Sequence, residues 1–252
     1  MRLKLTVAYD GRPYSGWGTQ PDGNTIQDHL EAAVAGVAKE KIRIHGSGRT
    51  DTGVHAVGQV MHFDAPDHLT MNPFNWVPAL NTKLPATIRA LECEEVASDF
   101  HARFSAVSKT YTYDLCLAPV LPPFQAGLVW HLPRQLDPET LGNALAFLRG
   151  KHDFRAFAAL RGNETDETDY VRVISQADLQ TTEQGYRLIY SGSGFLYKMV
   201  RLLTGAVVHA AQGRLSLEDL SLLLDQPQGL PHGKSPLCAP PDGLILDHVV
   251  YA

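Results

Sequence analysis

Residues 45–56 read HGSGRTDTGVHA, and this stretch concentrates more reactive chemistry than any other part of the chain. Its glycines let the backbone come close to a bulky ligand. Arg49 and Asp51 are two residues apart, so in an extended chain their side chains point to the same side. A neighbouring guanidinium favours the ionised form of a carboxylate, and an ionised, partly desolvated carboxylate can act as a nucleophile. Asp51 is therefore the candidate catalytic residue, although spacing alone favours an ordinary turn held by an ion pair.

The sequence on both sides of this stretch predicts an anchored loop. Apolar residues alternate from Leu3 to Val7, which indicates a first strand. A helix is predicted from a cap at Asn24 or Thr25 to about Lys39, because apolar residues recur there at helical spacing. A strand over 42–45 should lead into the loop and another over 59–64 away from it. Such anchoring suits a nucleophile.

The second half of the sequence begins a similar order of elements again. A strand is predicted over 107–117, with Tyr111 and Tyr113 on one face. A helix over 138–149, a hairpin over 171–193 and a helix over 194–211 follow. We therefore predict an α+β fold, in which helices cover antiparallel strands, with halves at residues 1–104 and 105–252.

Composition limits the classes of function. The formal net charge is -5, so any site for nucleic acid must be a local concentration of basic residues. The three cysteines lie far apart and form no C-x-x-C pair, which favours reduced thiols over a disulfide framework or a zinc site. No apolar run approaches the ~20 residues of a membrane span. We expect a cytoplasmic protein that does not enter a membrane.

The sequence GRTDTGVHA, followed by Gly58-Gln59-Val60, resembles the signature of the tRNA pseudouridine synthase A family. Further segments similar to family motifs lie at residues 9–17, 99–106, 110–113, 195–201 and 239–246. The resemblance thus extends over most of the chain. Gly18 and Thr19 stand where larger polar residues are usual, so the contacts of the loop from Gly11 to Gln20 do not follow from it.

The resemblance implies a fold and an activity. The fold would be two ferredoxin-like halves that share a continuous antiparallel sheet flanked by helices, with the active-site cleft between them. The protein would usually be a homodimer. Its activity would be isomerisation of uridine to pseudouridine in the anticodon stem-loop of tRNA, at positions 38 to 40, with no cofactor and no metal.

The resemblance also assigns roles to individual residues. Asp51 would be the nucleophile, with Arg49 as its neighbour in the motif and Arg201 as a second cation near the carboxylate. The target uridine must be flipped out of the stacked RNA, and Tyr111 would replace the lost stacking. Leu244 would line the base pocket. Simpler interpretations are a core strand tyrosine for Tyr111, a solvated helix residue for Arg201 and an ordinary buried leucine for Leu244.

Four basic residues beside the motifs are expected to form one cleft for tRNA phosphates. These are Arg103, Lys109, Lys198 and Arg201.

Two other functions remain open from the sequence. Five residues could ligate a metal for hydrolysis, namely His45, Asp51, His55, His62 and Asp64. Against a metal-dependent hydrolase, these residues lack helical H-x-x-x-H spacing, and an arginine beside a ligand would repel a cation. The third possibility is RNA binding without catalysis, which needs the basic cleft but no ionised Asp51.

Overall fold

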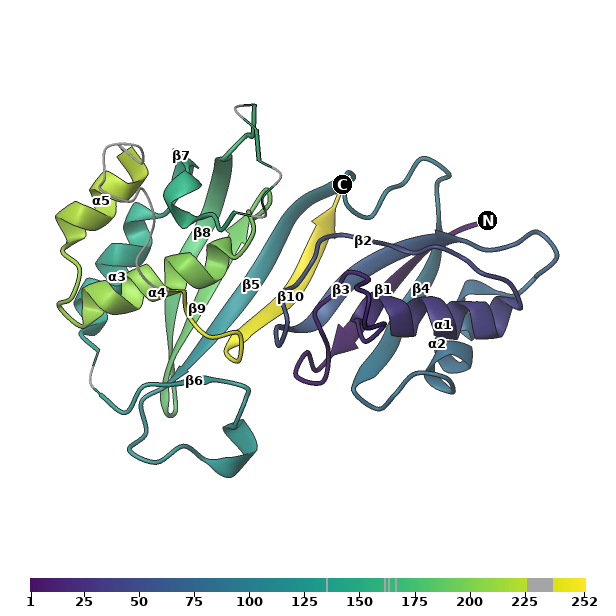
Figure 1. Cartoon of the computed structure of the whole chain (residues 1–252), viewed down its shortest axis with the longest axis horizontal. Helices are drawn as coiled ribbons and strands as arrows, with labels where there is room; N and C mark the ends of the chain where they lie inside the picture. Colours follow the sequence, from purple (N-terminus) through teal and green to yellow (C-terminus); the bar gives the residue numbers. More distant parts are fainter. Residues whose placement is uncertain (135, 161, 163, 166, 226–237) are drawn as a thin grey trace. The chain divides into compact units, whose positions relative to one another are not determined.

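The structure is a computed structural model that describes residues 1–134, 136–160, 162, 164–165, 167–225 and 238–252. The chain divides into two compact units (Figure 1). The first unit contains residues 1–109 and 245–252, and the second contains residues 110–244. The sequence predicted a single boundary between the halves, at residue 104. In the structure the last strand belongs to the first unit because it pairs with a strand there. A single cut in the sequence cannot describe such a long-range contact.

The strands of the first unit lie in the order β4-β1-β3-β10. β1 pairs antiparallel with both β3 and β4, whereas β10 runs parallel to β3. In β1 the alternation predicted from the sequence is confirmed, since every second side chain from Leu3 to Tyr9 is buried. The bounds are β1 (Arg2–Tyr9), β3 (His55–Asp64), β4 (Ile88–Val96) and β10 (Leu244–Tyr251).

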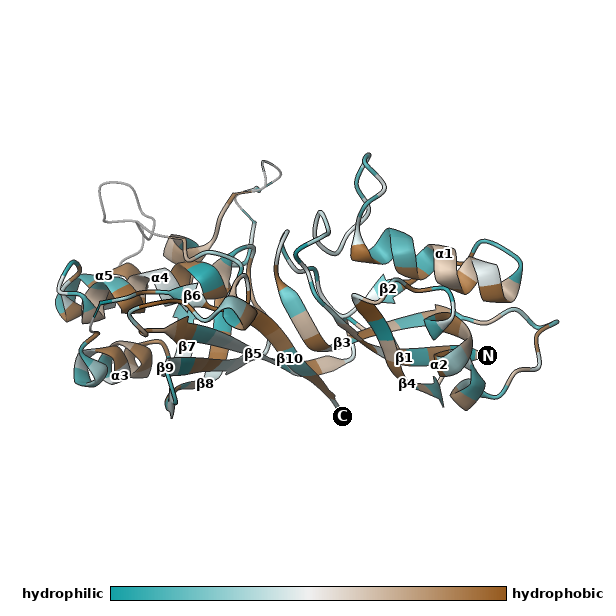
Figure 2. Cartoon of the chain, turned by 90° about the horizontal axis from the view of Figure 1, so that it is seen from below, coloured by the Kyte–Doolittle hydropathy of each residue, from teal (hydrophilic) through white to brown (hydrophobic). Residues whose placement is uncertain are grey.

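The helices of this unit are α1 (Ile26–Ala38) and α2 (Pro73–Asn81), and Figure 2 shows α1 across one side of β1, β3 and β4. Thr25 caps α1, because its side chain accepts a hydrogen bond from the Asp28 N–H while the Asp28 carboxylate accepts one from the Thr25 N–H. The strand predicted over 42–45 is reduced to β2 (His45–Gly46), a short partner of β3.

The second unit contains the β8–β9 hairpin predicted from the sequence, which turns directly from Thr182 to Gly185. Helix α3 packs on β8, and α3, α4 and α5 pack on one another (Figure 1). The short strands β6 and β7 were not predicted. The bounds are β5 (Ala106–Cys116), which begins in the first unit, β6 (Trp130–His131), α3 (Pro138–Phe147), β7 (Gly150–Asp153), β8 (Val171–Thr182), β9 (Gly185–Gly192), α4 (Met199–Ala211) and α5 (Leu217–Asp225), with single 3-10 turns at Pro123–Gln125 and Arg155–Phe157.

Helix α4 begins later than its apolar periodicity predicts. The helix was expected from residue 194, but Lys198 adopts a left-handed backbone with φ 58°, which right-handed helix cannot continue through. The chain before it is held by Tyr197, whose carbonyl accepts a hydrogen bond from the Ala159 N–H. Residues other than glycine rarely adopt this backbone conformation without a local constraint. The left-handed Lys198 therefore sets the point at which α4 starts.

The described residues thus form a mixed α/β fold with ten strands and five α-helices. The strands were predicted to be antiparallel, but β10 runs parallel to β3 and β5 runs parallel to β6. The three cysteines are free thiols. Within the described parts of the chain, no helix is long and apolar enough to cross a bilayer.

Candidate active site

The entry to the glycine-rich loop is fastened to β3 by a buried polar network. Ser47 donates its N–H to the Val60 carbonyl at 2.7 Å and its hydroxyl to Oε1 of Gln59 at 2.6 Å. The amide of Gln59 in turn donates to the Gly48 carbonyl at 3.1 Å. Ser47 and Gln59 are both 0% exposed, so their side chains cannot exchange these partners for water. The backbone just before Arg49 is therefore held in one position.

The central part of the loop is held from the other side by β1. The Thr50 hydroxyl lies 2.8 Å from the Tyr9 hydroxyl in a buried hydrogen bond. Beyond it, the Asp51 carbonyl accepts a hydrogen bond from the Val54 N–H at 3.1 Å, which closes a turn. The Asp51 side chain is half-buried and that of Arg49 is exposed. Asp51 thus stands on a turn whose two ends are both anchored, as predicted from the sequence.

The loop from Gly11 to Gln20 packs against the Asp51 loop through its backbone. Gly16 has φ 87°, and a Cβ added to it would lie 2.9 Å from the Thr50 carbonyl oxygen. A Cβ on Gly11 would lie 2.0 Å from the Val54 carbonyl oxygen, well inside any permitted contact. Any other residue at these two positions would push the loops apart.

The same loop also meets side chains of the Asp51 segment. A Cβ on Gly18 would lie 3.3 Å from Nε of Arg49, so the small residue at 18 leaves the guanidinium its place. Conversely, the Trp17 ring occupies the space beside Gly46, where a Cβ would lie 2.5 Å from the ring. These contacts could not be inferred from the sequence, because Gly18 departs from the family pattern.

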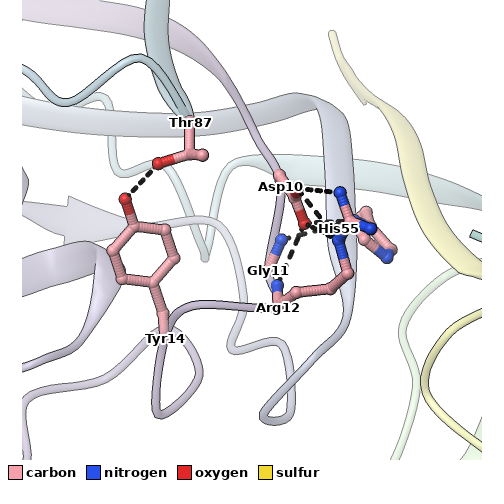
Figure 3. Close-up of polar contacts among 6 residues, drawn as sticks. All are labelled: Asp10, Gly11, Arg12, Tyr14, His55 and Thr87. Carbon is pink, nitrogen blue, oxygen red and sulfur yellow. Dashed lines mark hydrogen bonds and ion pairs between the residues drawn. The ribbon is translucent and has the colours of Figure 1, made fainter. Parts of the chain in front are cut away.

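The far end of the Asp51 loop is fixed by His55. Its Nδ1 accepts a hydrogen bond from the Gly11 N–H at 3.3 Å and lies 3.3 Å from an Asp10 oxygen (Figure 3). Arg12 pairs with the same carboxylate at 2.6 Å, and the hydrogen bonds from the Arg12 guanidinium and backbone N–H hold the pKa of Asp10 below its usual value. His55 is buried, and its contacts with Gly11 and Asp10 tie the two loops together.

Two of the predicted tRNA-binding cations also lie in the first unit. Arg103 is exposed, with its guanidinium carbon 5.5 Å from the centre of the Phe104 ring. Lys109 is half-buried, and its ammonium donates a hydrogen bond to the Ser47 carbonyl. Burial, followed by the positive charge of Arg103, lowers the pKa of Lys109 to about 8. The first unit therefore holds Arg49, Asp51, Arg103 and Lys109.

The second unit holds the other four predicted residues. Tyr111 is 8% exposed and meets the Phe195 ring edge-on, with 5.2 Å between ring centres. Arg201, in the first turn of α4, donates from Nε to the Ala239 carbonyl at 2.8 Å. Lys198 places its ammonium 5.3 Å from the Tyr197 ring centre. Leu244 is buried at the start of β10.

The residues needed by the metal-dependent alternative have other partners. Asp64 makes a two-pronged ion pair with Arg2 at 2.8 and 2.9 Å, and His55 contacts Asp10. His62 stacks on His45, with 5.0 Å between ring centres, and its Nδ1 accepts from the Ala102 N–H. Among the residues that the structure describes, no three His, Cys, Asp or Glu side chains are placed to hold a metal ion.

The buried histidine His62 makes folding stability sensitive to acid. Burial, with the neighbouring His101 and His45, lowers the pKa of His62 from 6.5 to about 4. Between these values the unfolded chain binds a proton that the folded chain rejects, so stability falls as the pH falls from 6.5 toward 4. We expect this residue to remove roughly 2 kcal/mol of unfolding free energy between about pH 7 and pH 5.

Urea titrations at the two pH values measure this loss. The variant His62→Asn keeps an acceptor for the Ala102 N–H but does not titrate, so its unfolding free energy should change less with pH. His68→Gln, at an exposed position, is the matched control and should follow the wild-type curve. Equal pH dependence in all three proteins would contradict the assignment.

The sequence pattern does not predict the buried supports of the loop. Gln59 stands in the signature without a predicted role, and the pattern predicts no role for Ser47, Tyr9 or Gly16. One signal was present, because Gln59 is the one polar residue in the run AVGQVM over residues 56–61, at the start of a predicted strand. A polar group in such a position must find a buried partner.

Comparisons with known proteins show which family this chain resembles. A family described as "tRNA pseudouridine synthase" matches residues 5–105 and 144–252. The chain is 53% identical over 253 residues to a tRNA pseudouridine synthase A from Akkermansia muciniphila, covering 99% of this chain and 95% of that protein. It is 39% identical to tRNA pseudouridine synthase A 2 from Clostridium perfringens, covering 99% of each. The Bacillus subtilis tRNA pseudouridine synthase A is also 39% identical, covering 100% of this chain and 99% of that protein.

Proposed function

Because this chain belongs to the tRNA pseudouridine synthase family, we propose a mechanism in which Asp51 is the nucleophile that converts uridine to pseudouridine in tRNA. The observation that supports it is the half-buried Asp51 on a turn anchored at both ends, by Gln59 on one side and His55 on the other. A carboxylate held in this way loses little freedom when it attacks. Neither a metal-dependent hydrolase nor a non-catalytic RNA-binding protein has comparable support.

The reaction rearranges bonds without an external reagent. The bond between the ribose C1′ and N1 of uracil breaks, the base turns, and a bond from C1′ to C5 forms. C5 loses a proton and N1 gains one, so atoms and electrons balance without a cofactor. In this proposal Asp51 attacks the flipped nucleotide, and Arg49 and Arg201 stabilise negative charge on the carboxylate before and after attack.

The remaining assignments concern the substrate. We propose that the target uridines lie at positions 38 to 40 of the anticodon stem-loop and that Leu244 lines the pocket for the base. Arg103 and Lys198, with Arg201, supply positive charge toward phosphates on a chain whose net charge is -5. A homodimer that works in the cytoplasm, where tRNA is modified, completes the proposal. Family resemblance supports each of these points.

The stacking role of Tyr111 can be separated from a structural one. Base stacking on an aromatic ring is worth ~1 to 3 kcal/mol by alanine substitution. Tyr111→Ala should therefore lower the single-turnover rate at least about tenfold, because the flipped uridine loses its stacking surface. Tyr111→Phe keeps the ring and should lose much less. Equal losses in the two variants, both folded by circular dichroism, would refute stacking and point to the hydroxyl.

The function itself is tested by mapping pseudouridine in unmodified tRNA before and after incubation with the pure protein. Pseudouridine should appear at one or more of positions 38 to 40. With tritium at C5 of uridine, release of label should accompany each isomerisation, since C5 gives up its hydrogen. Binding of tRNA without release of label would overturn the proposal in favour of a non-catalytic role.

A further inference from the structure

Lys109 lies behind the Asp51 loop in an environment that is costly for a charge. Its side chain is half-buried, and its ammonium meets the Ser47 carbonyl and the face of Gly48. A Cβ on Gly48 would lie 3.0 Å from Nζ, so the glycine leaves room for the ammonium. Arg103 is close enough to repel it. Removing an ammonium from water beside another cation costs free energy, and the hydrogen bond to the Ser47 carbonyl must offset part of that cost.

The contact falls at the point where the loop leaves β2. Ser47 is held toward β3 by its own N–H and hydroxyl, which bond to Val60 and Gln59. Its carbonyl points instead to Lys109, which extends from β5. The stem of the loop is thus held between two strands. A hydrogen bond from an ammonium is roughly twice as strong as one between neutral groups.

We propose that Lys109 is a positioning residue, which holds the stem of the Asp51 loop from the β5 side and thereby fixes the place of the carboxylate. This inference rests on the proposed function, since it concerns the residue assigned as nucleophile there. It also goes beyond the expected contact of Lys109 with tRNA phosphates, because the ammonium is directed at the backbone of its own chain. The two roles predict different defects.

A series of three variants distinguishes charge, hydrogen bonding and shape. Lys109→Arg keeps charge and donors, Lys109→Gln keeps a donor without charge, and Lys109→Met keeps only the stem. At saturating tRNA, the single-turnover rate should fall about tenfold or more for Met, less for Gln, and within about threefold for Arg. The affinity for tRNA should stay within about threefold throughout. Lys41→Met, at an exposed position, is the matched control and should be unaffected.

Amide hydrogen exchange supplies a readout that is independent of catalysis. In Lys109→Met the amides of residues 47–54 should exchange faster, among them those of Ser47 and Val54, whose hydrogen bonds define the loop. Exchange in α3 and in the β8–β9 hairpin should be unchanged, which distinguishes a local release from global destabilisation.

Two results would overturn the proposal. One is weaker tRNA binding in Lys109→Met, with a salt slope reduced by about one and an unchanged single-turnover rate, which would assign a phosphate contact instead. The other is an unchanged exchange rate across residues 47–54. If the wild-type protein made no pseudouridine, the proposed function would fail, while the exchange comparison would still decide whether Lys109 holds the loop.

Discussion

Replacement of Asp51 by asparagine is expected to lower the rate of isomerisation by roughly a thousandfold or more, since it removes the nucleophile while keeping its shape. The turn itself should survive, because the hydrogen bond that closes it runs from the Val54 N–H to the backbone carbonyl of residue 51. Binding of tRNA should therefore stay within a few-fold of wild type. Single-turnover assays and equilibrium binding on the same preparation measure the two quantities.

The control for this experiment is Asp67→Asn, which makes the same chemical change at an exposed position of the first unit. It should retain full activity. A near-normal rate in Asp51→Asn would refute the nucleophilic mechanism. A parallel loss of rate and tRNA affinity, with Asp67→Asn unaffected, would show that Asp51 serves in binding.

Gln59→Leu is expected to have the second largest effect, although the residue need not touch the substrate. Leucine has a similar size but leaves the buried Ser47 hydroxyl and the Gly48 carbonyl without their present partner. The unfolding free energy should fall by about 2 to 4 kcal/mol, because buried polar groups are left unsatisfied. The released loop should also lower turnover about a hundredfold, since small misplacements of a reacting group are costly.

A double-mutant cycle with Ser47→Ala tests this explanation. Removing both partners leaves fewer unsatisfied groups than removing Gln59 alone, so the double variant should be more stable than the sum of the two single losses predicts. Denaturant unfolding of the four proteins gives the coupling free energy. Strict additivity would contradict a direct bond between the two side chains.

Elements with a strong local pattern were predictable from the sequence. The alternation from Leu3 to Val7 located β1, and apolar residues at helical spacing after Thr25 located α1. The start of α4 was predicted too early, because the left-handed backbone of Lys198 follows from the tertiary fold and leaves no trace in apolar periodicity. The parallel pairing of β10 with β3 joins distant segments and likewise has no local signal.

The sequence motif points to the proposed reactive residues of the candidate site but not to the residues that support them. The motif around Asp51 identified the carboxylate and its arginine neighbour, whereas the contacts of Gln59 and Lys109 with the loop depend on strand register and burial. Lys109 illustrates the limit. A lysine beside a family motif predicted a phosphate contact, but only the three-dimensional arrangement shows its ammonium directed at the Ser47 carbonyl.

The contact between the 11–20 loop and the Asp51 loop has a consequence for variation among related enzymes. At Gly11 and Gly16 the two loops meet through their backbones. A side chain at either position would therefore displace the turn that carries Asp51. Thr19 and Gln20 are exposed instead. The exposed side chain of Thr19 is thus free to diverge, and a fluorescent label attached there would report on the loop that packs against the Asp51 turn.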